Sequence, residues 1–192
     1  AIQSKLLSKV VVAIDSETTK ESINCLNIVM TSDKHQSGTD RVAEVSENYD
    51  CDIVINIQGD EPGIDPDLID KLITLFDDPK VEMASVASTD LHQHDFTNDN
   101  VVKVNLDNEN NAISFVRNNM EPEQIYYRHI GIYAYRKKTL NFFTSLDQSE
   151  NEKKHSLEQL RALDNNIAIK LLISDFNHRS IDTKEDLKNY EN

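Results

Sequence analysis

Two adjacent carboxylates, Asp60 and Glu61, directly follow an apolar run of the chain, residues 53–57. One possible chemistry for them is metal binding, because Mg²⁺ prefers carboxylate and phosphate oxygens. Open α/β sheets bind their ligands beyond the carboxyl ends of the strands, and Asp60 stands at such an end. The alternative is that both residues form a turn before Pro62. Spacing alone leaves both interpretations open.

Two further groups of polar residues stand at the beginning of predicted helices. Asp182 precedes Thr183, so it could cap a helix or supply a second, distant carboxylate to a bridging metal site. The segment SGTDR, residues 37–41, places a glycine, two hydroxyls and an arginine at another helix start, which can hold an anion or a polar ring edge. The alternative for this segment is an ordinary helix cap followed by a surface arginine.

Two other segments place polar side chains among apolar neighbours. In RHIGIYAYR, residues 128–136, His129 could be functional, although a single histidine in such surroundings is more often a satisfied core residue. In SLEQLRAL, residues 156–163, the leucines form the predicted buried stripe. Glu158 and Gln159 therefore leave the helix on another side, where the alternative to a binding role is a solvated face.

Strands and helices alternate in the first part of the chain, which predicts an α/β fold with a mostly parallel sheet and helices on both faces. The segments 101–106 and 112–116 flank DNENN as a β-hairpin inserted into that fold. The other predicted strands cover residues 9–14, 27–31, 52–57, 83–88, 126–135 and 167–173, and the predicted helices begin at residues 18, 37, 66, 137, 153 and 183.

The amino-acid composition limits the classes of ligand that the protein is expected to bind. Lys and Arg number 20 against 34 Asp and Glu, a net charge of −14, which argues against a nucleic-acid binder. An acidic protein can still bind a nucleotide when a divalent cation supplies positive charge. The chain shows no stretch that approaches the roughly 20 apolar residues of a membrane helix, and we expect one domain over residues 1–192.

Five segments occur in an order that resembles one family, the 3-deoxy-manno-octulosonate cytidylyltransferases, or CMP-Kdo synthetases, of lipopolysaccharide biosynthesis. The segments are HQSGTDRVAEV, DIVINIQGDEP, YYRHIGIYAYR, LEQLRAL and IDTKEDL. The resemblance implies a Rossmann-like nucleotide-diphospho-sugar transferase fold. It implies a Mg²⁺-dependent reaction of CTP with Kdo that gives CMP-Kdo and pyrophosphate. It also implies a cytoplasmic homodimer with the hairpin at about residues 101–116 in the contact.

The resemblance also assigns roles to residues of this chain. It implies that Asp60 and Asp182 are catalytic and bind the metal. An anionic sugar acid suits Arg and His for its carboxylate, and Glu and Gln for its hydroxyls. The nucleotide-binding residues that it implies are Ser37, Gly38, Thr39 and Arg41, and the sugar-binding residues are Gln58, Arg117, His129, Tyr133, Glu158 and Gln159.

The chain departs from the family at its start. The family begins with a strand and a basic, glycine-containing loop that holds the triphosphate, and nothing here matches them; the segment between Arg117 and Tyr126 is also short. We therefore expect a domain that is incomplete at its N-terminus and poorly active as given. Turnover close to that of a chain restored at its N-terminus would contradict this expectation.

Two alternative functions stay open. One is a cytidylyltransferase for another acid sugar, such as a sialic acid. The other is a non-catalytic relative that binds a nucleotide or a partner. Pyrophosphate release with CTP and each sugar acid distinguishes the first alternative.

Overall fold

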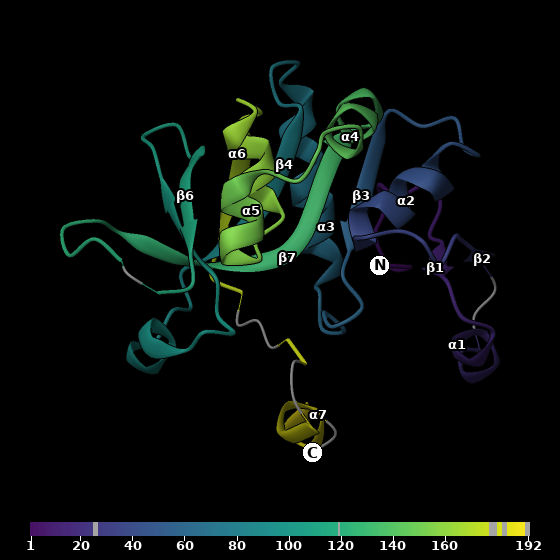
Figure 1. Cartoon of the computed structure of the whole chain (residues 1–192), viewed down its shortest axis with the longest axis horizontal. Helices are drawn as coiled ribbons and strands as arrows, with labels where there is room; N and C mark the ends of the chain where they lie inside the picture. Colours follow the sequence, from purple (N-terminus) through teal and green to yellow (C-terminus); the bar gives the residue numbers. More distant parts are fainter. Residues whose placement is uncertain (25–26, 119, 177–179, 182–183, 191–192) are drawn as a thin grey trace.

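The computed structural model describes residues 1–24, 27–118, 120–176, 180–181 and 184–190 (Figure 1). Its strands are β1 (Val12–Ile14), β2 (Ile28–Met30), β3 (Ile53–Ile57), β4 (Met83–Ser88), β5 (Lys103–Leu106), β6 (Ala112–Val116), β7 (Tyr126–Arg136) and β8 (Ile169–Ser174). Its helices are α1 (Glu17–Ser22), α2 (Gly38–Ser46), α3 (Pro66–Thr74), α4 (Lys137–Thr144), α5 (Glu150–His155), α6 (Gln159–Asp164) and α7 (Lys184–Tyr190), with short 3-10 turns η1 (Leu75–Asp77) and η2 (Gln93–Thr97).

The central sheet is mixed, so the prediction of a mostly parallel sheet is wrong. Its strands lie in the order β6-β5-β7-β4-β8, and β3 also pairs with β7. β4 and β8 are parallel, whereas β7 runs antiparallel to β3, β4 and β5. Parallel neighbours need a long crossover, usually a helix. The described residues between β6 and β7 contain no helix, and β7 returns beside β5 in the opposite direction.

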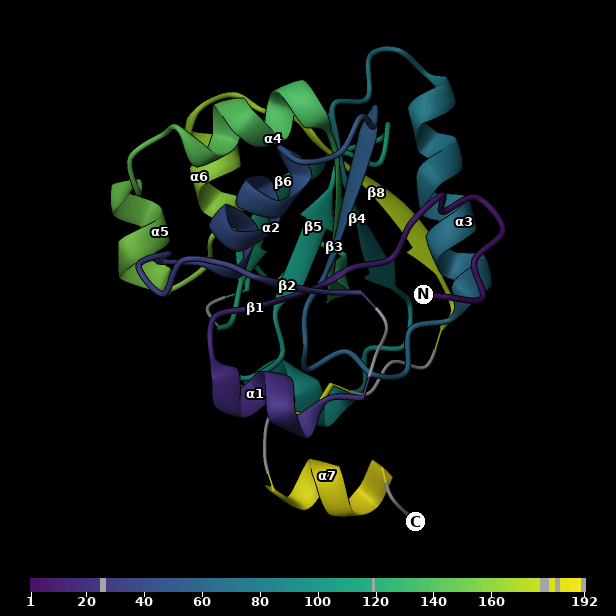
Figure 2. The ribbon, with the colours of Figure 1, turned by 90° about the vertical axis from the view of Figure 1, so that its right-hand side faces the viewer.

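The prediction of helices on both faces is confirmed (Figure 2). Two cores form because successive side chains of β7 point to opposite faces of the sheet. Ile130 and Ile132 pack with α3 on one face, and Tyr133 and Tyr135 pack beneath α4 and α6 on the other. All four side chains are at least nine-tenths buried, so β7 is the element to which both helical layers attach.

Local sequence explains where the helices begin. Ser37 caps α2 by accepting from the Asp40 N–H, and Asp65 caps α3, whose first residue is Pro66. The helix predicted to run from residue 153 to 164 is wrong, because two helices occupy this region. Ser156 adopts a left-handed conformation, with φ 52°, and ends α5. Glu158 consequently stands at the start of α6 instead of inside a longer helix.

β3 is paired along one edge. β7 pairs with that edge over the whole length of β3, and within the described chain no strand pairs with the opposite edge. β1 and β2 form a separate parallel pair, and α2 contacts both β1 and β3. The side chains of Ile53, Val54 and Ile55 are only partly buried, although the run is apolar.

None of the helices in the described part of the chain combines the length and the apolar character that crossing a membrane requires.

Candidate functional site

β3 and β5 pair with different halves of the same edge of β7 and leave a gap at Gly131. Ile57 is the last residue of β3 in register, opposite Ile132, and Lys103 of β5 lies opposite Arg128. The Gln58 N–H donates to the Gly131 carbonyl at 3.4 Å. The turn that follows β3 therefore fills the space between the two strands, at a carboxyl strand end where α/β proteins bind ligands.

Glu61 fastens this turn to β7. Its Oε1 accepts a hydrogen bond of 3.1 Å from the Gly131 N–H, and its own N–H donates to the Gln58 carbonyl at 3.2 Å. A Cβ at residue 131 would lie 2.8 Å from the same Oε1, so a larger residue there would force the Glu61 carboxylate to shift. Glu61 is 8% exposed. Glu61 is therefore part of the turn, and its bonds to Gly131 and Gln58 also fix the position of the preceding residue, Asp60.

Asp60 is exposed at the tip of the turn. Its carbonyl accepts a 2.9 Å hydrogen bond from the N–H of Ile181, which brings a distant part of the chain to this turn. The other predicted metal ligand, Asp182, lies outside the described residues. Within the described part of the chain no three acidic, His or Cys side chains cluster as a metal site. A single exposed carboxylate still fits Mg²⁺, which keeps waters and takes phosphate oxygens from its substrate.

The start of α2 lies against the same turn. A Cβ on Gly38 would stand 3.2 Å from the Gln58 side-chain oxygen, so these two residues are in contact. Gly38 was predicted for the nucleotide and Gln58 for the sugar. The structure brings these two residues together, although 20 positions separate them in the sequence.

Thr39 points away from solvent and is fully buried. Its hydroxyl donates to Oε2 of Glu158 at 2.7 Å and accepts from Nδ2 of Asn56 at 3.3 Å. The Ser37 hydroxyl is also close enough to the Glu158 carboxylate to lower its pKa. The start of α2 is thereby joined to the start of α6, and the alternative of a solvated face for Glu158 and Gln159 is wrong, since Gln159 is also buried.

Glu158 combines burial with a network of partners. Burial raises the pKa of Glu158, and the hydrogen bonds from Thr39 and Ser37 and the charge of Arg161 oppose that rise. A guanidinium nitrogen of Arg161 lies 3.7 Å from Oε1 of Glu158. The same guanidinium donates twice to Glu152, at 2.6 and 2.8 Å, and this bidentate pair is buried. Arg161 is therefore held rigidly beside Glu158.

His129 and Tyr133 lie on the same face of β7, with ring centroids 5.4 Å apart. His129 Nε2 lies 2.8 Å from the Ser85 hydroxyl, which is also 2.8 Å from the Ile132 carbonyl. Because a carbonyl can only accept, Ser85 donates to Ile132 and His129 donates to Ser85 from Nε2. Burial raises the pKa of Tyr133, so its hydroxyl stays protonated.

Arg117 lies just beyond β6 and is half-buried. Its guanidinium donates to the Asp99 carbonyl at 2.7 Å, and its own carbonyl accepts from Lys103 Nζ at 2.6 Å. Lys103 is fully buried, and desolvation lowers the pKa of its ammonium group. These bonds hold the backbone at Arg117 to the loop before β5.

The Arg41 side chain makes its hydrogen bonds and ion pair with residues outside the predicted site. Its guanidinium pairs with Asp15 at the end of β1, and its Nε donates to Thr31 Oγ1 at 3.1 Å. The structure does not bring Arg41 to Gln58 or Glu158. It connects α2 with the β1–β2 pair instead.

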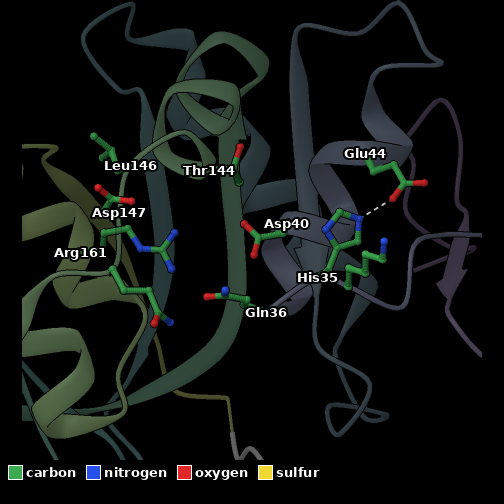
Figure 3. Close-up of a pocket in the computed structure, with 10 residues that line it drawn as sticks. His35, Gln36, Asp40, Glu44, Thr144, Leu146, Asp147 and Arg161 are labelled. Atoms are coloured by element: carbon green, nitrogen blue, oxygen red, sulfur yellow. Dashed lines mark hydrogen bonds and ion pairs between the residues drawn. The ribbon is translucent and has the colours of Figure 1, made fainter.

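A separate hollow of about 450 Å³ opens beside α2 (Figure 3). Figure 3 shows Asp40 and Arg161 facing each other across it, with the hydrogen-bonded pair His35 and Glu44 at one end. None of the predicted site residues that the structure describes lines this hollow.

Three residues of the network were not predicted from the sequence. Asn56, Ser85 and Arg161 are all buried and polar. Each stands between two apolar residues of the sequence, in IVINI, MASVAS and LEQLRAL respectively. Since a buried polar side chain needs a partner, such interruptions were the available signal.

Comparison with known proteins identifies relatives of this chain in one family. The family model described as "Cytidylyltransferase" matches residues 1–171. The 3-deoxy-manno-octulosonate cytidylyltransferase of Chloroherpeton thalassium is 39% identical, over 97% of this chain and 80% of the relative. The enzyme of the same name from Pelobacter propionicus is 36% identical, over 96% of this chain and 80% of the relative.

Solved structures agree with the sequence matches. The structure of CMP:2-keto-3-deoxy-manno-octonic acid synthetase complexed with CTP superposes with a TM-score of 0.89 at 31% identity, over 98% of this chain and 81% of that one. The 4-diphosphocytidyl-2C-methyl-D-erythritol synthase of Anaerococcus prevotii has a TM-score of 0.61 at 14% identity, over 98% of this chain and 79% of that one. The second match shows a shared fold alone.

Proposed function

Because this chain belongs to the cytidylyltransferase family and is a homologue of the 3-deoxy-manno-octulosonate cytidylyltransferases, we propose that it activates Kdo with CTP. The products are CMP-Kdo and pyrophosphate. The Kdo 2-hydroxyl attacks the α-phosphorus of CTP in line, and pyrophosphate leaves from the opposite side. Such transfer depends mainly on positioning and on neutralising charge.

One observation supports the proposal: the first turn of α2, proposed for the nucleotide, touches two residues proposed for the sugar. Gly38 contacts Gln58, and Thr39 donates a hydrogen bond to Glu158. Two substrates held by these groups would lie side by side, as in-line attack requires.

The proposed roles follow from the donors and acceptors of each side chain. The N–H groups at the start of α2 are suited to the polar edge of cytosine. Arg117 and His129 would bind the sugar carboxylate, and the buried Glu158 carboxylate would accept from sugar hydroxyls.

Asp60, with Asp182 as a proposed second ligand, would hold Mg²⁺. When bound, Mg²⁺ would neutralise charge at the α-phosphate and lower the pKa of the attacking hydroxyl. Exposure of the Asp60 carboxylate at the end of β3 supports this assignment.

We further propose a cytoplasmic homodimer whose contact includes the hairpin of β5 and β6. The hairpin exposes Ile113, which is 56% accessible on the isolated chain. Sedimentation velocity tests the assembly: a dimer that Ile113→Lys dissociates is expected, and a monomer at all concentrations would contradict it.

Pyrophosphate release tests the reaction. The chain is incubated with CTP, Mg²⁺ and either Kdo or a sialic acid, beside the Chloroherpeton enzyme as a positive control. We expect release with Kdo to exceed release with the sialic acid. Release with the sialic acid alone would favour the other acid-sugar function, and CTP binding with no release would favour a non-catalytic relative.

A further inference from the structure

We propose that the hydroxyls of Ser37 and Thr39 are positioning groups for Glu158, and that through them the start of α2 couples nucleotide binding to sugar binding. This inference rests on the proposed function and deepens it. It gives the Thr39 side chain a different role from the nucleotide contact that the family resemblance implies.

The Thr39 hydroxyl is already engaged by partners within the chain. Thr39 has no accessible surface, and its single proton is donated to Glu158 Oε2 at 2.7 Å. One lone pair accepts from Asn56 at 3.3 Å. A nucleotide can therefore reach this residue only through its backbone, whereas the side chain serves Glu158.

The Ser37 hydroxyl acts on the same carboxylate. Its oxygen accepts from the Asp40 N–H at 3.1 Å as the cap of α2. The hydroxyl is also close enough to the Glu158 carboxylate to lower its pKa. Any movement of the first turn of α2 consequently moves both the Thr39 donor and the Ser37 hydroxyl relative to Glu158.

The opposite side of Glu158 is fixed. Arg161 lies 3.7 Å from Oε1 and is locked by its bidentate bonds to Glu152. With Arg161 immobile, the orientation of the Glu158 carboxylate depends on α2. The side chain of Glu158 remains 24% accessible, and no group of the described chain donates a hydrogen bond to its Oε1, which leaves that oxygen as an acceptor for a ligand.

The coupling follows from these contacts. A nucleotide bound against Gly38 restricts the segment that carries Ser37 and Thr39, and therefore orders Glu158 before the sugar arrives. A sugar bound to Glu158 orders the nucleotide site by the same amount, because binding coupling is reciprocal.

The test compares Thr39→Val, which keeps the shape and removes the hydroxyl, with Thr39→Ser, which keeps the hydroxyl. Calorimetry of the full chain gives the affinities for Mg²⁺-CTP alone, Kdo alone, and Kdo with the non-hydrolysable analogue of CTP. We expect Thr39→Val to weaken Kdo binding about tenfold and abolish the gain from nucleotide, with CTP affinity unchanged. Thr39→Ser should behave as the wild type. Equal weakening of CTP and Kdo by Thr39→Val would overturn the proposal.

A second readout needs no substrate. The Glu158 carboxyl carbon is followed against pH by NMR, and its signal is assigned by its loss in Glu158→Gln. Thr39→Val should raise the pKa of Glu158, because a donor to the charged form is lost. Ser37→Gly should do the same, and glycine is tolerated at a helix cap, so this variant stays informative if Thr39→Val unfolds.

Different results would contradict the proposed function and the positioning role of the hydroxyls. A wild-type chain that binds CTP but no Kdo contradicts the proposed function, while the Glu158 titration still decides the role of the hydroxyls. An unchanged titration in both variants would overturn the positioning role, whatever the chain binds.

Discussion

The Lys103 ammonium group donates to the Arg117 carbonyl at 2.6 Å, and to the Asn98 carbonyl at 2.9 Å. Lys103 belongs to β5, whereas the two carbonyls belong to the loops on either side of the hairpin. A fully buried lysine therefore closes the base of the hairpin beside the predicted sugar-binding arginine.

Lys103→Met should destabilise the chain by about 1–3 kcal/mol, because it leaves two carbonyls without their donor. Urea unfolding followed by circular dichroism measures the loss. Lys138→Met, at an exposed position of α4, is the matched control and should leave the midpoint unchanged. Equal midpoints for Lys103→Met and the wild type would show that water replaces the ammonium group without cost.

Gly131→Ala should destabilise the chain by about 1–3 kcal/mol. The added Cβ would lie 2.8 Å from the Glu61 oxygen, which must move and give up its bond to the Gly131 N–H. Thermal unfolding measures the effect. Gly59→Ala is the control, since its Cβ meets no atom within 4 Å. If both variants melt alike, Glu61 does not fasten the turn to β7.

Glu158→Gln should remove a pH dependence of stability. Burial raises the pKa of Glu158 in the folded chain, with the Asp40 charge adding to the rise. The folded state therefore binds more protons than the unfolded state between the ordinary value of 4.5 and the raised value. The resulting stability is present below pH 4.5 and is lost as the pH rises through the folded pKa.

Urea unfolding of the two proteins at several pH values from 4.5 to 8 checks this sign. The free energy of unfolding of the wild type should fall relative to that of Glu158→Gln as the pH rises, since Asp40 and Arg161 are common to both proteins. A relative rise would mean that the hydrogen bonds and Arg161 dominate over burial.

Asp60→Asn should abolish Mg²⁺-dependent pyrophosphate release and leave the fold intact, because the amide is a weaker metal ligand than the carboxylate. Pyrophosphate assays over a Mg²⁺ series, with circular dichroism, measure both properties. Asp67→Asn, on an exposed part of α3, is the control for the loss of one charge. Near-normal activity of Asp60→Asn would remove this residue from the metal site.

Much of the fold could be predicted, because its signals are local. Pro66 after Asp65 marked the start of α3, and the β-branched run in residues 53–57 marked β3. Strand direction could not be predicted in the same way, since it depends on connections that the alternation of elements does not reveal. The break at Ser156 was missed because a left-handed serine has no strong sequence signal.

The candidate site could likewise be predicted only in part from the sequence. The motifs assigned Thr39 to the nucleotide and Gln58 and Glu158 to the sugar, and these roles stay predictions; the structure shows that the segments carrying the three residues are in contact. Spacing could not reveal that the Thr39 side chain turns inward, since burial of a hydroxyl depends on partners 119 residues away in the sequence. The position of Arg41 beside Asp15 likewise depends on a tertiary contact.

The unpaired edge of β3 has a consequence for handling the protein. Within the described residues no strand pairs with the N–H and C=O groups along this edge, and together with partly exposed Ile53 and Ile55 these groups form a template onto which a strand of another molecule can add. Charged side chains that oppose such pairing are absent from the five residues of β3. Association through this edge would increase with concentration and withdraw chains from solution, so the binding and unfolding measurements are best made on dilute samples.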